Sequence, residues 1–175
     1  GENTTYINAL KMGESEINLG LVLTKGSIKS YSVKNCKTNH RGEFILNPSH
    51  FELLSGEEYV IEWQMFWHKG NDDFLQKAYQ YDNFINIEAP QFTVFQNEKI
   101  EFTVKSKNSL ANLKIICDGE EIPYKTEDNG CRVSFIPKRV GEHRFDIYID
   151  EISTYTEFFV AEELETLLYK RIKFI

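Results

Sequence analysis

The side chains best suited to bind a ligand lie together in residues 63–73, WQMFWHKGNDD. Trp67 is followed directly by His68, and Asp72 and Asp73 come shortly after. Aromatic rings can stack on the apolar faces of sugar rings, and carboxylates beside them accept hydrogen bonds from hydroxyl groups. These four residues are therefore the candidate carbohydrate-binding site.

The same imidazole and carboxylates could serve as metal ligands or as an acid–base pair. However, the chain has no His-x-His or Glu-x-x-His spacing, and His143 and the other histidines are isolated along the sequence. Asp72 and Asp73 also suit the first turn of a helix, where the helix dipole favours negative charge. We therefore expect this helix-start role for the two aspartates, with no metal site and no cofactor.

Motifs of nucleophilic catalysis and phosphate binding are absent from the sequence. There is no Gly-x-Ser-x-Gly elbow, no phosphate-binding glycine loop and no Cys-x-x-Cys pair. The chain has 27 acidic residues, but none of them forms a pair that the sequence marks as catalytic, because glycosidase carboxylates are distant along the chain. We expect no enzymatic activity; a free-standing glycan-active enzyme is the less favoured alternative.

The strand that carries the two tryptophans determines how they are presented. In a strand, alternate side chains share one face, so Tyr59, Ile61, Trp63, Met65 and Trp67 point the same way. A face of five large apolar residues is typical of a protein core. The pattern therefore predicts that the two indole rings are buried, and the alternative is an exposed aromatic platform that binds sugars.

Period-two alternation predicts an all-β fold for most of the chain. In the first half, strands are expected over residues 4–9, 16–24, 27–33, 43–46, 51–54 and 58–68, with a polar interruption at 34–42. A short helix is expected over 71–81. In the second half, strands are expected over residues 85–88, 91–95, 99–105, 113–117, 132–136, 141–149 and 153–160. Such closely spaced short strands are typical of an immunoglobulin-like sandwich.

These elements predict two tandem β-sandwich units joined by a short connector helix. We expect a β-sandwich portion over residues 1–70, a connector over 71–88 and an immunoglobulin-like sandwich over 89–160. Residues 161–175 form an amphipathic helix with glutamates in its first turns and basic residues in its last. No stop signal follows this helix, so we expect it to be a truncated helix that leads to an absent domain.

Composition and charge exclude some classes of partner. The net charge is −7 and the basic residues are scattered, which disfavours nucleic acid and anionic membrane surfaces. No apolar run approaches the roughly 20 residues that span a bilayer. Three cysteines leave at least one thiol unpaired. Cys117 and Cys131 could form a disulfide, but two small buried side chains on neighbouring strands are favoured.

Two stretches resemble a known kind of module. Residues 41–48 (RGEFILNP), 54–63 (LSGEEYVIEW) and 66–70 (FWHKG) resemble the closing strands of β-sandwich domains in multidomain bacterial glycosidases and polysaccharide lyases of the six-hairpin (α/α-barrel) type. Residues 137–145 (PKRVGEHRF) are similar to the Pro-x-x-x-Gly-Glu-His sequence that leads into a late strand of bacterial immunoglobulin-like modules.

The resemblance implies a non-catalytic structural module, because the catalytic residues of those enzymes lie in the helical barrel. Its partner would be a neighbouring catalytic domain of the same chain, with polysaccharide as a further possible partner. Its location would be extracellular or periplasmic. The alternative functions are a carbohydrate-binding module and a cell-surface adhesion module.

Overall fold

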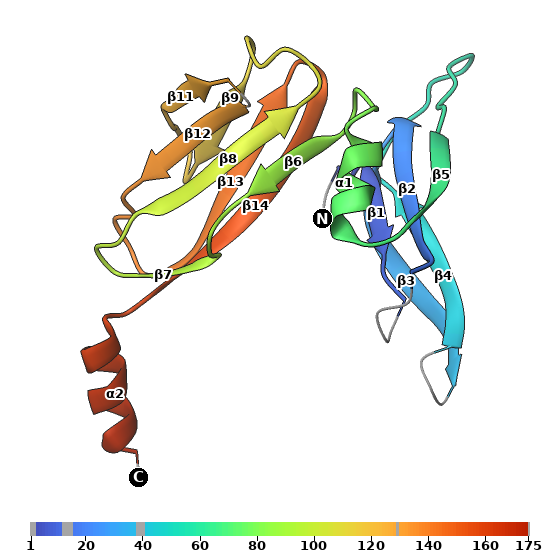
Figure 1. Cartoon of the computed structure of the whole chain (residues 1–175). Coiled ribbons are helices and arrows are strands. Elements are labelled where there is room, and N and C mark those ends of the chain that lie inside the picture. Colours follow the sequence, from blue (N-terminus) through green and yellow to red (C-terminus); the bar gives the residue numbers. More distant parts are fainter. Residues whose placement is uncertain (1–2, 12–15, 38–40, 129, 175) are drawn as a thin grey trace. The chain divides into compact units, whose positions relative to one another are not determined.

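A computed structural model describes residues 3–11, 16–37, 41–128 and 130–174. Side chains of residues 36, 37, 41 and 42 are outside this description. The chain divides into two compact units, Gly1–Phe84 (unit 1) and Ile85–Ile175 (unit 2). The predicted all-β fold with two short helices is confirmed for the part of the chain that is described (Figure 1).

Unit 1 contains a three-stranded antiparallel sheet, a separate β-hairpin and one helix. The sheet has the order β1-β2-β5, formed by Tyr6–Ala9, Asn18–Lys25 and Glu62–His68. The hairpin pairs β3 (Ile28–Lys37) with β4 (Arg41–Pro48). Helix α1 (Asn71–Ala78) follows β5 after a short turn. The left-handed turn between β2 and β3 contains Gly26, whose φ of 77° suits glycine.

Helix α1 covers one face of the three-stranded sheet (Figure 1). Phe74 and Ala78 of the helix are buried together with Val22 of β2 and Phe84, and Phe66 of β5 packs against this cluster. Period-two alternation places Val22 and Phe66 on the covered face, while the 3.6-residue helical period places Phe74 and Ala78 on one side of α1. The side chains that these two periods place on facing surfaces form the core of unit 1.

Two sequence predictions for unit 1 were wrong. The polar stretch 34–42 does not interrupt the strands: β3 continues to Lys37, and β4 begins at Arg41. Residues 51–54 form no strand, and β5 begins only at Glu62. Strand pairing depends on a partner with free backbone groups, and the polarity of a short segment does not reveal that partner.

Unit 2 is an immunoglobulin-like sandwich of a five-stranded and a four-stranded sheet (Figure 1). The first sheet has the order β10-β9-β13-β14-β7, formed by Glu120–Glu121, Lys114–Cys117, Gly141–Ile149, Ile152–Ala161 and Thr93–Phe95. The second has the order β11-β12-β8-β6, formed by Tyr124–Glu127, Gly130–Phe135, Ile100–Ser106 and Ile85–Glu88. The pairing of β14 with β7 is parallel, and the other pairings are antiparallel.

The core of unit 2 lies between its two sheets. Phe102 of β8 contacts Phe145 of β13 and Phe158 of β14, with ring centroids 5.1 and 5.4 Å apart. All three rings are essentially buried. Cys117 and Cys131 are free, buried thiols in this core, as favoured, but they lie on strands of different sheets and not on neighbouring strands.

Helix α2 (Leu164–Ile172) follows β14 after a short link. Its apolar side chains lie on one stripe, as predicted, but none of its residues is buried. Within the described residues, neither helix has the length and apolar character that crossing a membrane requires.

Candidate functional site

Trp63 and Trp67 lie on the face of the β1-β2-β5 sheet that α1 does not cover. Trp63 is opposite Leu23 of β2 and Trp67 is opposite Leu19, so indole rings and leucines share this face. The two tryptophans are 53% and 66% exposed. The prediction that their face is a core face was therefore wrong, because alternation shows which residues share a face but not which face receives a cover.

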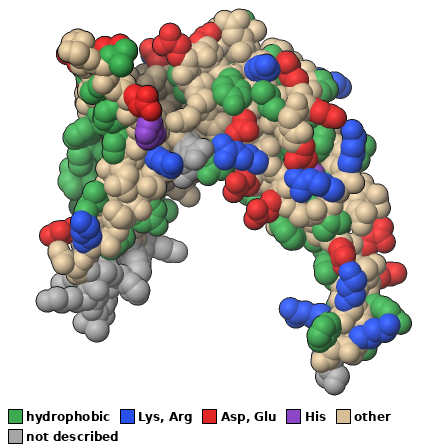
Figure 2. Space-filling view, turned by 180° about the vertical axis from the view of Figure 1, so that it is seen from behind, with side chains coloured by type: hydrophobic (Ala, Val, Ile, Leu, Met, Phe, Trp, Pro, Cys, Tyr) green, Lys and Arg blue, Asp and Glu red, His purple; other side chains and the backbone are tan. Residues whose placement is uncertain are grey.

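The exposed face is almost wholly apolar. We call it the tryptophan face and define it by the register of its strands; its members are Ile7, Leu19, Leu21, Leu23, Trp63, Met65 and Trp67. The space-filling view shows hydrophobic side chains gathered along the flank of unit 1 (Figure 2). At one end of the face is a depression of about 150 Å³, lined by Trp63, Ile61 and apolar residues of β2, β3 and β4.

His68 lies on the opposite face of the sheet from Trp67. It is 2% exposed and packs edge-on against Phe74 of α1, with ring centroids 5.3 Å apart. Its Nδ1 lies 2.9 Å from the carbonyl oxygen of Gly70. Its Nε2 has no hydrogen-bond partner among the described residues. This burial prevents His68 from contacting a ligand that stacks on Trp67.

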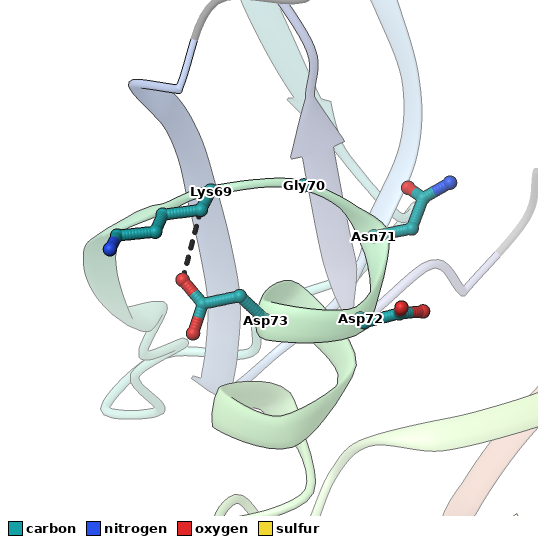
Figure 3. A pocket seen from close by; sticks show the side chains of 5 residues that line it. All are labelled: Lys69, Gly70, Asn71, Asp72 and Asp73. Atoms are coloured by element: carbon teal, nitrogen blue, oxygen red, sulfur yellow. Dashed lines mark hydrogen bonds between the residues drawn. The ribbon is translucent and has the colours of Figure 1, made fainter.

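Asp72 and Asp73 lie at the beginning of α1, beside a shallow pocket of about 290 Å³ that residues 69–73 line (Figure 3). The Asp73 carboxylate accepts hydrogen bonds from the Lys69 backbone amide and the Lys77 ammonium, each at 2.9 Å. Lys77 foremost, and then the Lys69 amide, hold the pKa of Asp73 below its usual value. Asp73 therefore has the predicted helix-start role, and Asp72 is exposed.

The structure thus separates the four candidate residues into two groups. Trp67 belongs to the tryptophan face, whereas His68 is buried on the other side of the sheet and Asp72 and Asp73 begin the helix that covers that side. They do not converge on one cavity in the described part of the chain. The feature that the sequence did not reveal is the breadth of the exposed apolar face around Trp67.

A second cluster, in unit 2, was also missed. His143 is 1% exposed, and its Nδ1 lies 2.9 Å from Asp118 Oδ2 while its Nε2 lies 2.9 Å from the Arg139 carbonyl oxygen. Both oxygens can only accept, so both ring nitrogens must donate if both hydrogen bonds are to form. Arg139 also donates to Asp118 Oδ1 at 2.6 Å. The sequence suggested that His143 is isolated, but in the structure it has two hydrogen-bond partners.

This cluster holds the β9–β10 turn against β13. Asp118 and Gly119 form that two-residue turn, with φ angles of 51° and 82°. An Asp-Gly pair after an apolar strand is a hairpin signal, which could have located the turn, although not its partner His143. Arg139 foremost lowers the pKa of Asp118.

The neighbouring Cys117 thiol completes a group of three potential metal ligands with Asp118 and His143, whose donor atoms lie within 4.8 Å of one another. Burial raises the pKa of Cys117 to about 12, so the neutral thiol dominates at neutral pH. The thiolate is the form that binds metals, and the Asp118 oxygens already pair with Arg139 and His143. The arrangement therefore fits a structural hydrogen-bond network better than a metal centre.

Comparison with known proteins gives no family for the chain. It does give a solved structure that matches this chain over its entire length. No protein-family model matches it, and neither does a curated protein. A solved structure described as a polysaccharide lyase matches 100% of this chain with a TM-score of 0.88 and 30% sequence identity. The match covers 27% of that chain, so this chain spans about a quarter of its relative's length.

A second match is to fibronectin(III)-like modules of Clostridium thermocellum CbhA, with 19% identity over 45% of this chain and 98% of that chain. Its TM-score of 0.35 is too low to show a shared fold. The first match shows that the whole chain shares the fold of one segment of a much longer polysaccharide lyase.

Proposed function

We propose that this chain is a non-catalytic structural module of a larger carbohydrate-active enzyme. Its task is to pack on a neighbouring catalytic domain of the same polypeptide and to orient it. Stacked sheets suit this task because they form a rigid spacer whose outer faces are free to vary.

The observation that carries the proposal is the match of this entire chain to one segment of a polysaccharide lyase. At a TM-score of 0.88, both units together correspond to one segment of that protein, which covers 27% of its length. In the relative, the segment that matches both β units is therefore part of a much longer chain. The proposal transfers this arrangement to the present chain.

The domain organisation is part of the same proposal. The expected portions 1–70 and 89–160 lie within the two β units, the expected connector 71–88 is shared between them because α1 packs in unit 1 and β6 belongs to unit 2, and residues 161–175 lead into the catalytic domain. The exposed apolar stripe of α2, which includes Leu164 and Leu168, supports this last point because such a stripe normally packs on a neighbour. We propose a helical barrel of the six-hairpin type as that neighbour.

The proposal is tested by comparing the 175-residue chain with the whole natural gene product. Both are incubated with a panel of polysaccharides, and the release of reducing ends and of unsaturated oligosaccharides is measured. We expect turnover by the gene product alone. Turnover by the 175-residue chain, or a gene product without further domains, would refute the proposal.

A second candidate function is carbohydrate binding at Trp67, with Asp72 as a further contact; of the four residues expected from the sequence, His68 is buried and Asp73 is bonded to Lys69 and Lys77. The observation that favours it is the 66% exposure of the Trp67 side chain, which leaves the indole face free to stack on a sugar. Because Asp72 is exposed as well, a ligand that reaches around the edge strand β5 would be needed to contact both.

Affinity electrophoresis in gels that contain single polysaccharides tests this second function. Retardation of the chain that Trp67→Ala abolishes, and that the unit 2 control Ile136→Ala preserves, would support it. Equal mobility in all gels would refute it. Circular dichroism of both variants checks that they are folded.

A further inference from the structure

The three-stranded sheet of unit 1 has apolar side chains on both faces: α1 covers one face, whereas the other is buried only around Leu23 and leaves Trp63, Met65 and Trp67 exposed. On the covered face, Val22 and Phe66 pack against α1. On the tryptophan face, Leu21 of β2 is opposite Met65 of β5, which is 56% exposed. Antiparallel sheets with one solvated face normally carry polar residues there. A sheet with two apolar faces therefore requires a second covering layer.

The apolar surface continues onto the β3–β4 hairpin. Tyr31 is opposite Leu46 and Val33 is opposite Phe44 in the register of this hairpin, and all four side chains are exposed. The depression beside Trp63 links the tryptophan face to the hairpin, because residues of β2, β3, β4 and β5 line it. Exposed apolar surface that extends over several strands is typical of interaction sites.

The chemistry of the tryptophan face favours a protein surface as its occupant. Apart from the two indole groups, its side chains offer no conventional hydrogen-bonding group: they are leucine, isoleucine and methionine. A sugar ring would bury hydroxyl groups there without partners, which costs free energy. Two copies of this chain would each bring a net charge of −7, which opposes self-association. Tryptophan at the centre of an apolar patch is typical of protein interface hot spots.

We propose that the tryptophan face is the docking surface for an apolar face of another domain of the same polypeptide. The proposal rests on the proposed function and adds to it the surface that makes the contact. The extent of the relative supplies the partner: its chain continues well beyond the segment matched here, which is 27% of its length. Docking in this way supplies the covering layer that the sheet of unit 1 lacks.

Hydroxyl-radical footprinting with peptide-level mass spectrometry tests the proposal. Oxidation rates of Trp63, Met65 and Trp67 are compared between the 175-residue chain and the whole gene product. We expect these rates to be at least about 10-fold lower in the gene product, while exposed Tyr148 of unit 2 reacts equally in both. Equal rates at the three tryptophan-face residues would overturn the proposal.

A matched pair of variants shows that the protection comes from docking. In the gene product, Trp67→Asp should restore rapid oxidation of Met65, because a carboxylate is costly to bury in an apolar contact. The control Ile136→Asp places the same charge at an exposed apolar position of unit 2 and should leave Met65 protected. Trp67→Phe should retain most of the protection. If Trp67→Asp leaves Met65 protected, the face is not the docking surface.

Three outcomes overturn the proposal, and the first two of them also identify a different occupant. Protection of the 175-residue chain that grows with its concentration indicates a second copy. Protection that appears only when a polysaccharide is added indicates a glycan. A gene product that degrades polysaccharide while its tryptophan face stays fully reactive leaves the proposed function standing and rejects this surface alone.

Discussion

Replacing Gly20 with alanine should destabilise unit 1, although alanine is normally the better residue within a strand. A Cβ atom at this position would lie 2.5 Å from Cε2 and 2.7 Å from Cζ of Phe66. The Phe66 ring stacks on Phe74 and on Tyr81, with centroids 5.7 and 6.2 Å apart. The ring is therefore packed against two aromatic neighbours, and moving it aside disturbs both contacts.

Two effects of opposite sign determine the magnitude. Removing a glycine from a strand interior stabilises by about 0.5–1 kcal/mol. Forcing an extra methyl group into a packed core costs about 1–3 kcal/mol. The contact distances are well below ordinary van der Waals separation, so we expect the second effect to dominate, with a net loss of about 1–2 kcal/mol. For a unit of this size, that lowers the Tm by roughly 4–15 °C.

Tryptophan fluorescence isolates the unfolding of unit 1, because the chain has two tryptophans and both lie on β5. Urea titrations of the native chain and of Gly20→Ala, followed at the tryptophan emission, give the free energy of unfolding of this unit. Far-UV circular dichroism over the same titrations follows both units together. We expect the fluorescence midpoint to fall in the variant.

The double variant Gly20→Ala/Phe66→Leu is the control for the steric explanation. Leucine removes the ring atoms that the new Cβ would meet, so the cost of Gly20→Ala should be much smaller in the Phe66→Leu background than in the native one. A stability of Gly20→Ala equal to or above that of the native chain would refute the reasoning. Equal costs in the two backgrounds would refute it as well.

Three further predictions concern the hydrogen-bond network of unit 2. Because burial raises the pKa of Cys117 to about 12, this thiol should resist alkylation at pH 8 until the protein is unfolded, as mapped by mass spectrometry. Arg139 lowers the pKa of Asp118, so the stabilisation that this carboxylate contributes is present above its unfolded pKa of about 3.9 and is lost as the pH falls through the lower folded value. Acid unfolding of Asp118→Asn followed by circular dichroism should therefore show a weaker pH dependence below about pH 4. Finally, His143→Leu should cost unit 2 about 1–3 kcal/mol, because it leaves the Arg139 carbonyl without its buried partner; a urea midpoint unchanged from that of the native chain would contradict this.

The sequence was sufficient to predict an element where its local periodicity agrees with the burial of its residues. The predicted strand 141–149 coincides with β13, because strict alternation there matches a strand whose inner face is buried by the opposite sheet. The predicted helix near residues 71–81 also occurs, as α1, because Phe74 and Ala78 recur at helical spacing. Both elements carry their own signal, so no long-range information was needed.

The prediction of the candidate site failed because the arrangement of its residues depends on contacts between segments that are distant in the sequence. Alternation placed Trp63 and Trp67 on one face, which is correct, but the side of the sheet that α1 covers depends on how the chain turns after His68. Similarly, Asp118 and His143 are 25 residues apart, and only the pairing of β9 with β13 brings them together. Patterns within one strand cannot reveal either relation.

The position of β14 in its sheet determines how the sandwich responds to force. This strand lies between β13 and β7 and leads directly toward α2, so tension applied beyond residue 161 acts along the strand axis. Hydrogen bonds to both neighbours are then loaded together in shear and are not opened one at a time from an edge. The C-terminal strand of the sandwich is thus built into the interior of a sheet, where it resists mechanical extraction.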